Sequence, residues 1–80
     1  MWWLFEIIEK NGVLYRYAYS CEDWSLDGMI EYNAKNEQYS LIKPCGHDAD
    51  SKRAQERAIG KFAHYVVEEG FPARRRIICG

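Results

Sequence analysis

The sequence predicts an α+β fold in which an antiparallel sheet is covered on one face by a single C-terminal helix. Three observations lead to this fold class. The first half of the chain alternates runs of aromatic and β-branched residues with turn residues. One stretch near the C-terminus has the spacing of an amphipathic helix. Eighty residues without a linker, an internal repeat or a low-complexity segment predict one domain, residues 1–80.

The first two strands are predicted at residues 3–9 and 13–19, which are rich in aromatic and β-branched types. Asn11 and Gly12 stand between them. Asn-Gly is the strongest short hairpin signal, because a type I′ turn requires positive φ at both of its central residues. We therefore expect a hairpin with Asn11 and Gly12 as its two-residue loop.

This loop decides which side chains share a face of the hairpin. It places Ile8 opposite Tyr15, and residues directly opposite one another point to the same side. One predicted face of the hairpin contains Leu4, Glu6, Ile8, Val13, Tyr15, Tyr17 and Tyr19. The other predicted face contains Trp3, Phe5, Ile7, Leu14, Arg16 and Ala18. A single helix can cover only one of these two apolar faces.

A second hairpin is predicted from residues 28–32 and 37–43, around the turn residues 34–36. Residues 20–27 connect the two hairpins. A loop at residues 44–48 contains proline and glycine, and it separates strand periodicity from helix periodicity.

The helix is predicted over residues 49–69, and Asp48, Asp50 or Ser51 can cap its start. Apolar side chains recur along one arc at helical spacing, which indicates a helix lying on a sheet. The segment 70–72 combines a glycine suited to the helix end with a proline that prevents continuation. The residues of the apolar arc are Ala54, Ala58, Ile59, Phe62, Tyr65 and Val66.

The last residues, 74–79, form either a short fifth strand or an extended tail. The predicted order is therefore β-β-β-β-α-(β). This order describes a two-layer antiparallel meander of four strands, with the helix packed on one face.

Composition excludes several classes of protein. The chain is 48% hydrophobic and 29% charged, as in globular domains, and its net charge of −1 gives no global basic field for nucleic acid or acidic lipid. The apolar start reaches an acid at Glu6 without a basic region before it, so we expect no signal peptide. Uncharged runs are shorter than the ~18 residues that cross a membrane. We expect a cytoplasmic protein that does not bind membranes and whose three cysteines are reduced.

Cys21, Cys45, His47 and Cys79 are the candidate metal ligands, because three thiols and an imidazole make a tetrahedral zinc set. In an up-down meander, the segments that carry these residues end at the same edge of the sheet. The spacing fits no known zinc knuckle, however, and no Cys-x-x-Cys occurs. We therefore expect three ordinary reduced cysteines and no cofactor, with a zinc site as the alternative.

No enzyme signature is present. Cys45 and His47 stand too close together in one loop for an aligned nucleophile and base, and no third residue orients them. The sequence contains no phosphate-binding loop, Gly-x-Ser-x-Gly or His-Glu-x-x-His motif. We therefore expect no enzymatic activity.

Aromatic side chains are abundant, and on an open sheet face such side chains can stack single-stranded bases. Glu6 on the tyrosine face, the slightly negative charge and the missing Gly-aromatic RNP signature argue against nucleic acid as a partner. The tyrosines can instead form the core under the helix or a subunit interface. The predicted interaction surface comprises Trp2, Trp3, Phe5, Tyr15, Tyr17, Tyr19, Arg74 and Arg76.

The expected function is that of a non-enzymatic protein-interaction or self-association module, in the form of a homodimer or a complex with another protein. The reason is the apolar surplus on the two faces of the first hairpin. If one of these faces stayed in water, it would expose several hundred Å², more than monomers usually tolerate. A zinc-binding module and a single-stranded nucleic-acid-binding module are the alternatives.

Overall fold

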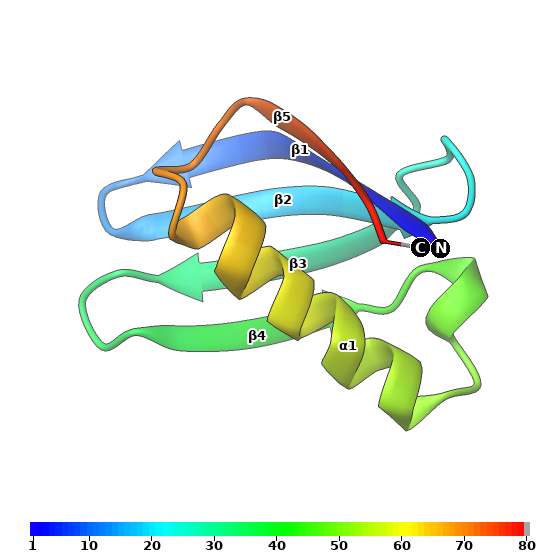
Figure 1. Ribbon diagram of the computed structural model, residues 1–80. Helices are drawn as coiled ribbons and strands as arrows, with labels where there is room; N and C mark the ends of the chain where they lie inside the picture. Colours follow the sequence, from blue (N-terminus) through cyan, green and yellow to red (C-terminus); the bar gives the residue numbers. More distant parts are fainter. Residues whose placement is uncertain (80) are drawn as a thin grey trace.

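The computed structural model describes residues 1–79 and confirms the predicted fold class. Five antiparallel strands form one sheet in the order β4-β3-β2-β1-β5, and one helix lies across one face of it (Figure 1). The helix α1 spans Lys52–Phe62 and continues through a π-helical turn, Ala63–Val67; a 3₁₀ turn, Gly46–Asp48, precedes it. The strands are β1 (Trp2–Asn11), β2 (Leu14–Cys21), β3 (Gly28–Asn33), β4 (Gln38–Lys43) and β5 (Arg74–Ile78).

The first hairpin forms, but its predicted loop is wrong by one residue. Asn11 pairs with Leu14, so that Gly12 and Val13 are the two loop residues. Of the two, only Gly12 has positive φ, at 63°. One positive φ at the first central position is the requirement of a type II′ turn, which glycine satisfies without strain.

A β-bulge at Ile8 then changes the pairing along the rest of β1. The register shifts between Ile7 and Glu9, so Ile8 is the extra residue and its side chain is half exposed. Beyond the bulge, Phe5 pairs with Tyr19 and Ile7 with Tyr17. The odd-numbered residues of both strands therefore share one face, because directly opposed residues point to the same side.

The predicted apolar surplus on both faces of the hairpin is consequently wrong. The face under α1, here called the helix face, holds most of the large apolar side chains of the hairpin, and the other, the open face, mixes apolar residues with charged and polar ones. Buried on the helix face are Trp3, Phe5, Tyr17, Tyr19, Cys21, Ile30 and Tyr32. The hairpin presents to the open face Leu4, Glu6, Leu14, Arg16, Ala18 and Ser20.

One end of the open face has its own cover. The rings of Trp2 and Trp24 lie 4.9 Å apart, and the Arg76 guanidinium lies 4.7 Å and 4.9 Å from their centroids. Leu4, which pairs with Arg76 and points to the same side, is fully buried. Trp2, Trp24 and Arg76 thus shield Leu4 at this end of the open face, while Ile78, which pairs with Trp2, stays 68% exposed.

The helix follows the predicted pattern. Ser51 is its N-cap, and the Ser51 hydroxyl accepts a hydrogen bond from Ala54 N at 3.1 Å. Ala58, Phe62 and Val66 recur every four residues and are fully buried against the sheet. This stripe supplies the helix side of the core.

Replacing glycine by alanine should change the free energy of unfolding in opposite directions at Gly28 and Gly60. A Cβ at Gly28 would meet the Tyr19 ring and would lie 2.7 Å from Cys45 N, so Gly28→Ala should lower the free energy of unfolding by about 1–3 kcal/mol. Gly60 lies in α1 with nothing within 4 Å of an added Cβ, so Gly60→Ala should raise it by about 0.5–1 kcal/mol. Chemical denaturation of both variants measures the two changes. Equal effects at the two positions would contradict the packing described here.

Candidate metal centre

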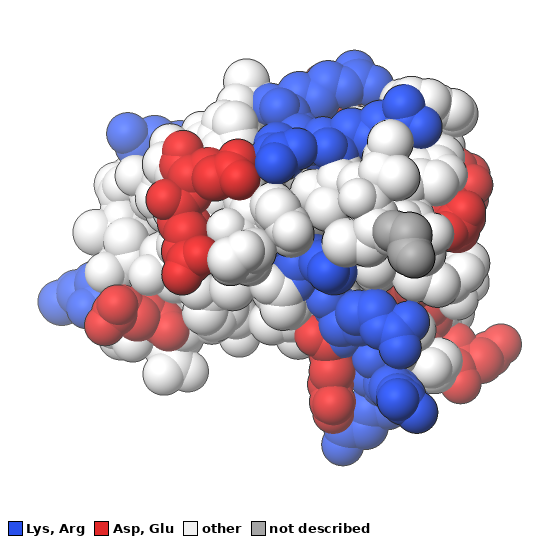
Figure 2. Space-filling model, in the orientation of Figure 1, with Lys and Arg blue, Asp and Glu red and all other residues white. Residues whose placement is uncertain are grey.

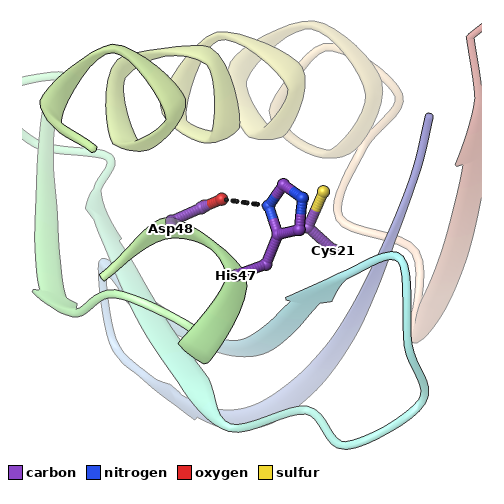
Figure 3. A group of neighbouring side chains, drawn as sticks. All are labelled: Cys21, His47 and Asp48. Atoms are coloured by element: carbon purple, nitrogen blue, oxygen red, sulfur yellow. Dashed lines mark hydrogen bonds and ion pairs between the residues drawn. The ribbon is translucent and has the colours of Figure 1, made fainter. Parts of the chain in front are cut away.

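One end of the sheet brings three potential metal ligands together. Cys21 is the last residue of β2, and His47 and Asp48 lie in the 3₁₀ turn that follows β4. One ligand atom from each of the three lies within 4.8 Å of the other two. Figure 3 shows the His47 ring between the carboxyl group of Asp48 and the thiol of Cys21. We call these three residues the Cys–His–Asp cluster.

Hydrogen bonds from the core hold the turn in place. The Tyr19 hydroxyl donates to Asp48 Oδ2 at 3.0 Å and accepts from Cys45 N at 3.1 Å. On the outer side of the turn, Gly46 N donates to Asp27 Oδ2 at 2.9 Å. The position of the 3₁₀ turn over the end of β2 therefore depends on a buried tyrosine of that same strand.

The cluster combines a buried carboxyl group with a histidine that reaches solvent. The Asp48 side chain is 1% exposed and that of His47 is 36% exposed, with Nδ1 3.1 Å from Asp48 Oδ1. In the His47 tautomer that carries its proton on Nδ1, this nitrogen donates to the Asp48 carboxylate. In the other tautomer, Nδ1 has a free lone pair and can act as a metal ligand.

Burial makes the nearby thiols poor nucleophiles. Burial, reinforced by the charge of Asp48, raises the pKa of the Cys21 thiol to about 12. Burial likewise raises the pKa of Cys45. With raised pKa values, both thiols are protonated near neutral pH. They are therefore poor nucleophiles, because the thiolate is the reactive form. The cluster has the residue types of a catalytic triad, but Cys21 makes no hydrogen bond to His47 among those found in residues 1–79.

The same three residues suit a metal ion better. Any three atoms within 4.8 Å of one another have a point within about 2.8 Å of all three, while zinc bonds measure ~2.0–2.3 Å. Inward movement by roughly half an ångström per ligand would therefore complete a site. Metal binding removes the thiol proton, so the high pKa of Cys21 sets a pH dependence for binding without preventing it.

The predicted zinc set is only partly assembled. Cys21 and His47 come together as expected, and Cys45 is buried beside them without joining the group. Cys79 lies elsewhere: it follows β5, and β1 separates β5 from β2, a distance of two strand spacings, ~9.6 Å. Lys61 Nζ donates to its sulfur at 3.1 Å.

Asp48 is a candidate ligand that its place in the sequence does not mark, because an aspartate just before a helix is typical of a helix cap. Ser51 is the cap instead, which leaves the Asp48 carboxyl free to point inward. The useful signal was its position next to His47. Two adjacent residues in a tight turn can both lie close to a side chain at the end of a neighbouring strand, as His47 and Asp48 lie close to Cys21.

The predicted interaction surface is largely interior. Trp3, Phe5, Tyr17 and Tyr19 are core residues under α1, so the tyrosine face is not open to bases. Tyr15 is half-buried and stacks on Phe71. The outer members of the set are Trp2, Arg74 and Arg76, with Trp24, 58% exposed, as a neighbour that the sequence analysis did not select.

Comparison with known proteins gives no assignment: no family model, curated protein or solved structure matches the chain. Within residues 1–79, α1 and its π-helical extension are too short and too polar to span a bilayer.

The three cysteines should differ in reactivity. In the native protein at pH 8, a thiol-specific reagent should modify Cys79 first, because Cys21 and Cys45 are buried with raised pKa values and hold little thiolate. Cys79→Ser should remove the fast phase, and all remaining thiols should react on unfolding. Rapid modification of Cys21 or Cys45 in the folded Cys79→Ser variant would contradict this assignment.

Proposed function

We propose that the chain is a small non-enzymatic binding module that holds one zinc ion through Cys21, His47 and Asp48. The convergence of these three donors at one end of the sheet is the observation that carries the proposal. Three protein ligands leave the fourth tetrahedral position for water or for a group from a partner.

Distances within the cluster support a tetrahedral ion. His47 Nδ1 and Asp48 Oδ1 are 3.1 Å apart, and two zinc ligands at bond lengths of ~2.0 Å lie ~3.3 Å apart in a tetrahedron. Nδ1 of His47 and Oδ1 of Asp48 are thus spaced to ligate one zinc ion together, with the His47 ring proton carried on Nε2. The 36% exposure of the His47 side chain supplies a path from solvent.

The donor types favour zinc over the harder cations. Calcium and magnesium prefer oxygen ligands, whereas a thiolate and an imidazole suit zinc and its neighbours among the transition metals. A chain of this length has a small core, and metal binding is one of the ways in which small domains gain stability. The free cysteines are consistent with a reducing compartment, and this supports our proposal of a cytoplasmic location.

Self-association remains a prediction, but its original basis is gone. It depended on an even division of the large apolar side chains between the two faces of the first hairpin, and Trp3, Phe5, Tyr17 and Tyr19 lie together on the helix face. The fourth coordination position gives a different reason to expect a partner, because a side chain from another protein could occupy it. We propose that the module's binding function centres on this position.

Zinc titration tests the proposed site. The untagged, chelator-treated protein should bind about one equivalent, and zinc at 100 times its dissociation constant should raise the free energy of unfolding by about 2.7 kcal/mol. Cys21→Ser and His47→Ala should abolish retention of the ion. Asp48→Asn, which still accepts the Tyr19 hydrogen bond, should weaken zinc binding. Cobalt substitution should give thiolate charge-transfer absorption that Cys21→Ser removes.

Matched variants outside the cluster serve as controls. His64→Ala and Cys79→Ser each remove a residue type of the cluster at a place distant from it, and both should bind zinc like the parent protein. Retention of less than about half an equivalent by the parent protein would end the proposal. Loss of zinc in Cys79→Ser with retention in Asp48→Asn would show that a different ligand set operates.

A further inference from the structure

Positive charge is concentrated on α1. The helix carries four basic residues and one acid, although the whole chain has a net charge of −1. Lys and Arg side chains gather over the N-terminal half of the helix and along β5 (Figure 2). Arg53, Arg57 and Lys61 recur every four residues and so follow one line along α1, in steps of ~6 Å.

The placement of these charges opposes helix stability. Lys52 and Arg53 occupy the first turn of α1, which contains no acid, while Glu68 and Glu69 follow its C-terminal end. The helix dipole favours acids at the start and bases at the end, which Lys61 in the last turn follows and Lys52 and Arg53 do not. Basic residues at the start add to the positive potential of the helix N-terminus.

The basic residues of α1 also lack acidic partners. Elsewhere Arg16 pairs with Glu31 at 2.8 Å, and Arg75 pairs with Glu69 at 2.8 Å. Within residues 1–79, by contrast, no carboxylate lies within 4 Å of the basic groups of Lys52, Arg53, Arg57 or Lys61. The first three of these side chains are exposed, so their charge is available to a partner.

The charge on α1 continues to β5 through an aromatic side chain. Lys61 Nζ lies 5.6 Å from the centroid of the Tyr65 ring, and the Arg75 guanidinium lies 5.3 Å from the same centroid. Arg75 is on the helix face of β5, opposite Phe5. We define the basic track as Arg53, Arg57, Lys61 and Arg75, with Tyr65 between the last two. Arg75 is already paired with Glu69, so within residues 1–79 the cations of the track that have no carboxylate within 4 Å are the three on α1.

We propose that the basic track binds the phosphate backbone of single-stranded nucleic acid. A line of cations interleaved with an aromatic side chain is the usual composition of surfaces that follow a single strand without reading its sequence. This surface is distinct from the tyrosine face considered from the sequence, which is buried. No member of the track belongs to the Cys–His–Asp cluster, so binding of nucleic acid can be tested separately from binding of zinc.

An acidic protein segment could satisfy the same charges, but the structure favours a nucleic-acid strand. The track runs along a helix and offers side-chain cations at regular intervals, as a repeating phosphate backbone requires. Of its four members, three come from the helix and only Arg75 from the edge strand. An extended peptide that recognised this protein by strand addition would instead follow β5 itself.

Fluorescence anisotropy with labelled 20-nucleotide thymidine and uridine oligomers tests the proposal. Binding should be saturable in 50 mM salt, with a dissociation constant on the order of 10 μM, and should weaken steeply by 200 mM salt. Arg53→Gln combined with Arg57→Gln keeps good helix formers and should weaken binding at least fivefold. It should also reduce the slope of log K against log salt by about 1.4, because each phosphate contact contributes ~0.7 on single strands.

Lys10→Gln with Lys35→Gln is the matched control. It removes the same charge from the opposite end of the sheet, at the two hairpin turns, and should change the affinity less than twofold. Equal losses in both double variants would overturn the proposal by showing that only net charge matters. Absence of saturable binding, or displacement by polyglutamate as effective as that by unlabelled oligonucleotide, would also overturn it, the latter in favour of an acidic protein partner. Circular dichroism of each variant confirms that it is folded.

Discussion

The extra residue at Ile8 is the constraint on which the rest of the structure depends. Without this bulge, the type II′ turn would place Phe5 opposite Ser20, and the apolar sides of β1 and β2 would face in opposite directions. With it, Phe5 meets Tyr19 and the two strands contribute to one core. A single helix is then sufficient to cover that core. The bulge thus decides both the composition of the interior and the polarity of the open face.

Sequence patterns were adequate for the elements and inadequate for their register. The order of strands and helix, the amphipathic stripe and the hairpins follow from periodicity and turn residues that are local in the chain. Register is different, because side chains alternate with a period of two and one inserted residue inverts a whole strand. Nothing in the residue types around Ile8 marks the insertion. The homodimer was inferred from the wrong register, so its basis disappeared with it.

The candidate site shows the same division between local and long-range information. Cys21 and His47 come together because the ends of an up-down meander meet at one edge of the sheet. Cys79 reaches that edge too, but the order β2-β1-β5 keeps it two strands away. Asp48 could not be distinguished from Ser51 as the helix cap without knowing which one faced Tyr19. Sequence spacing therefore predicted at which end of the sheet these residues lie, but not which strands they occupy side by side.

The net charge of the chain does not show how unevenly its charged residues are distributed. A value of −1 argued against polyanion binding, yet it is the sum of a basic helix and acidic surroundings. The two proposed sites also act in the same electrostatic direction. Ser51 N donates to the Asp48 carbonyl at 3.0 Å, so the cluster adjoins the start of α1. Zinc adds two positive charges and displaces the Cys21 proton, a net gain of one. A loaded site would thus strengthen the field that attracts a phosphate backbone.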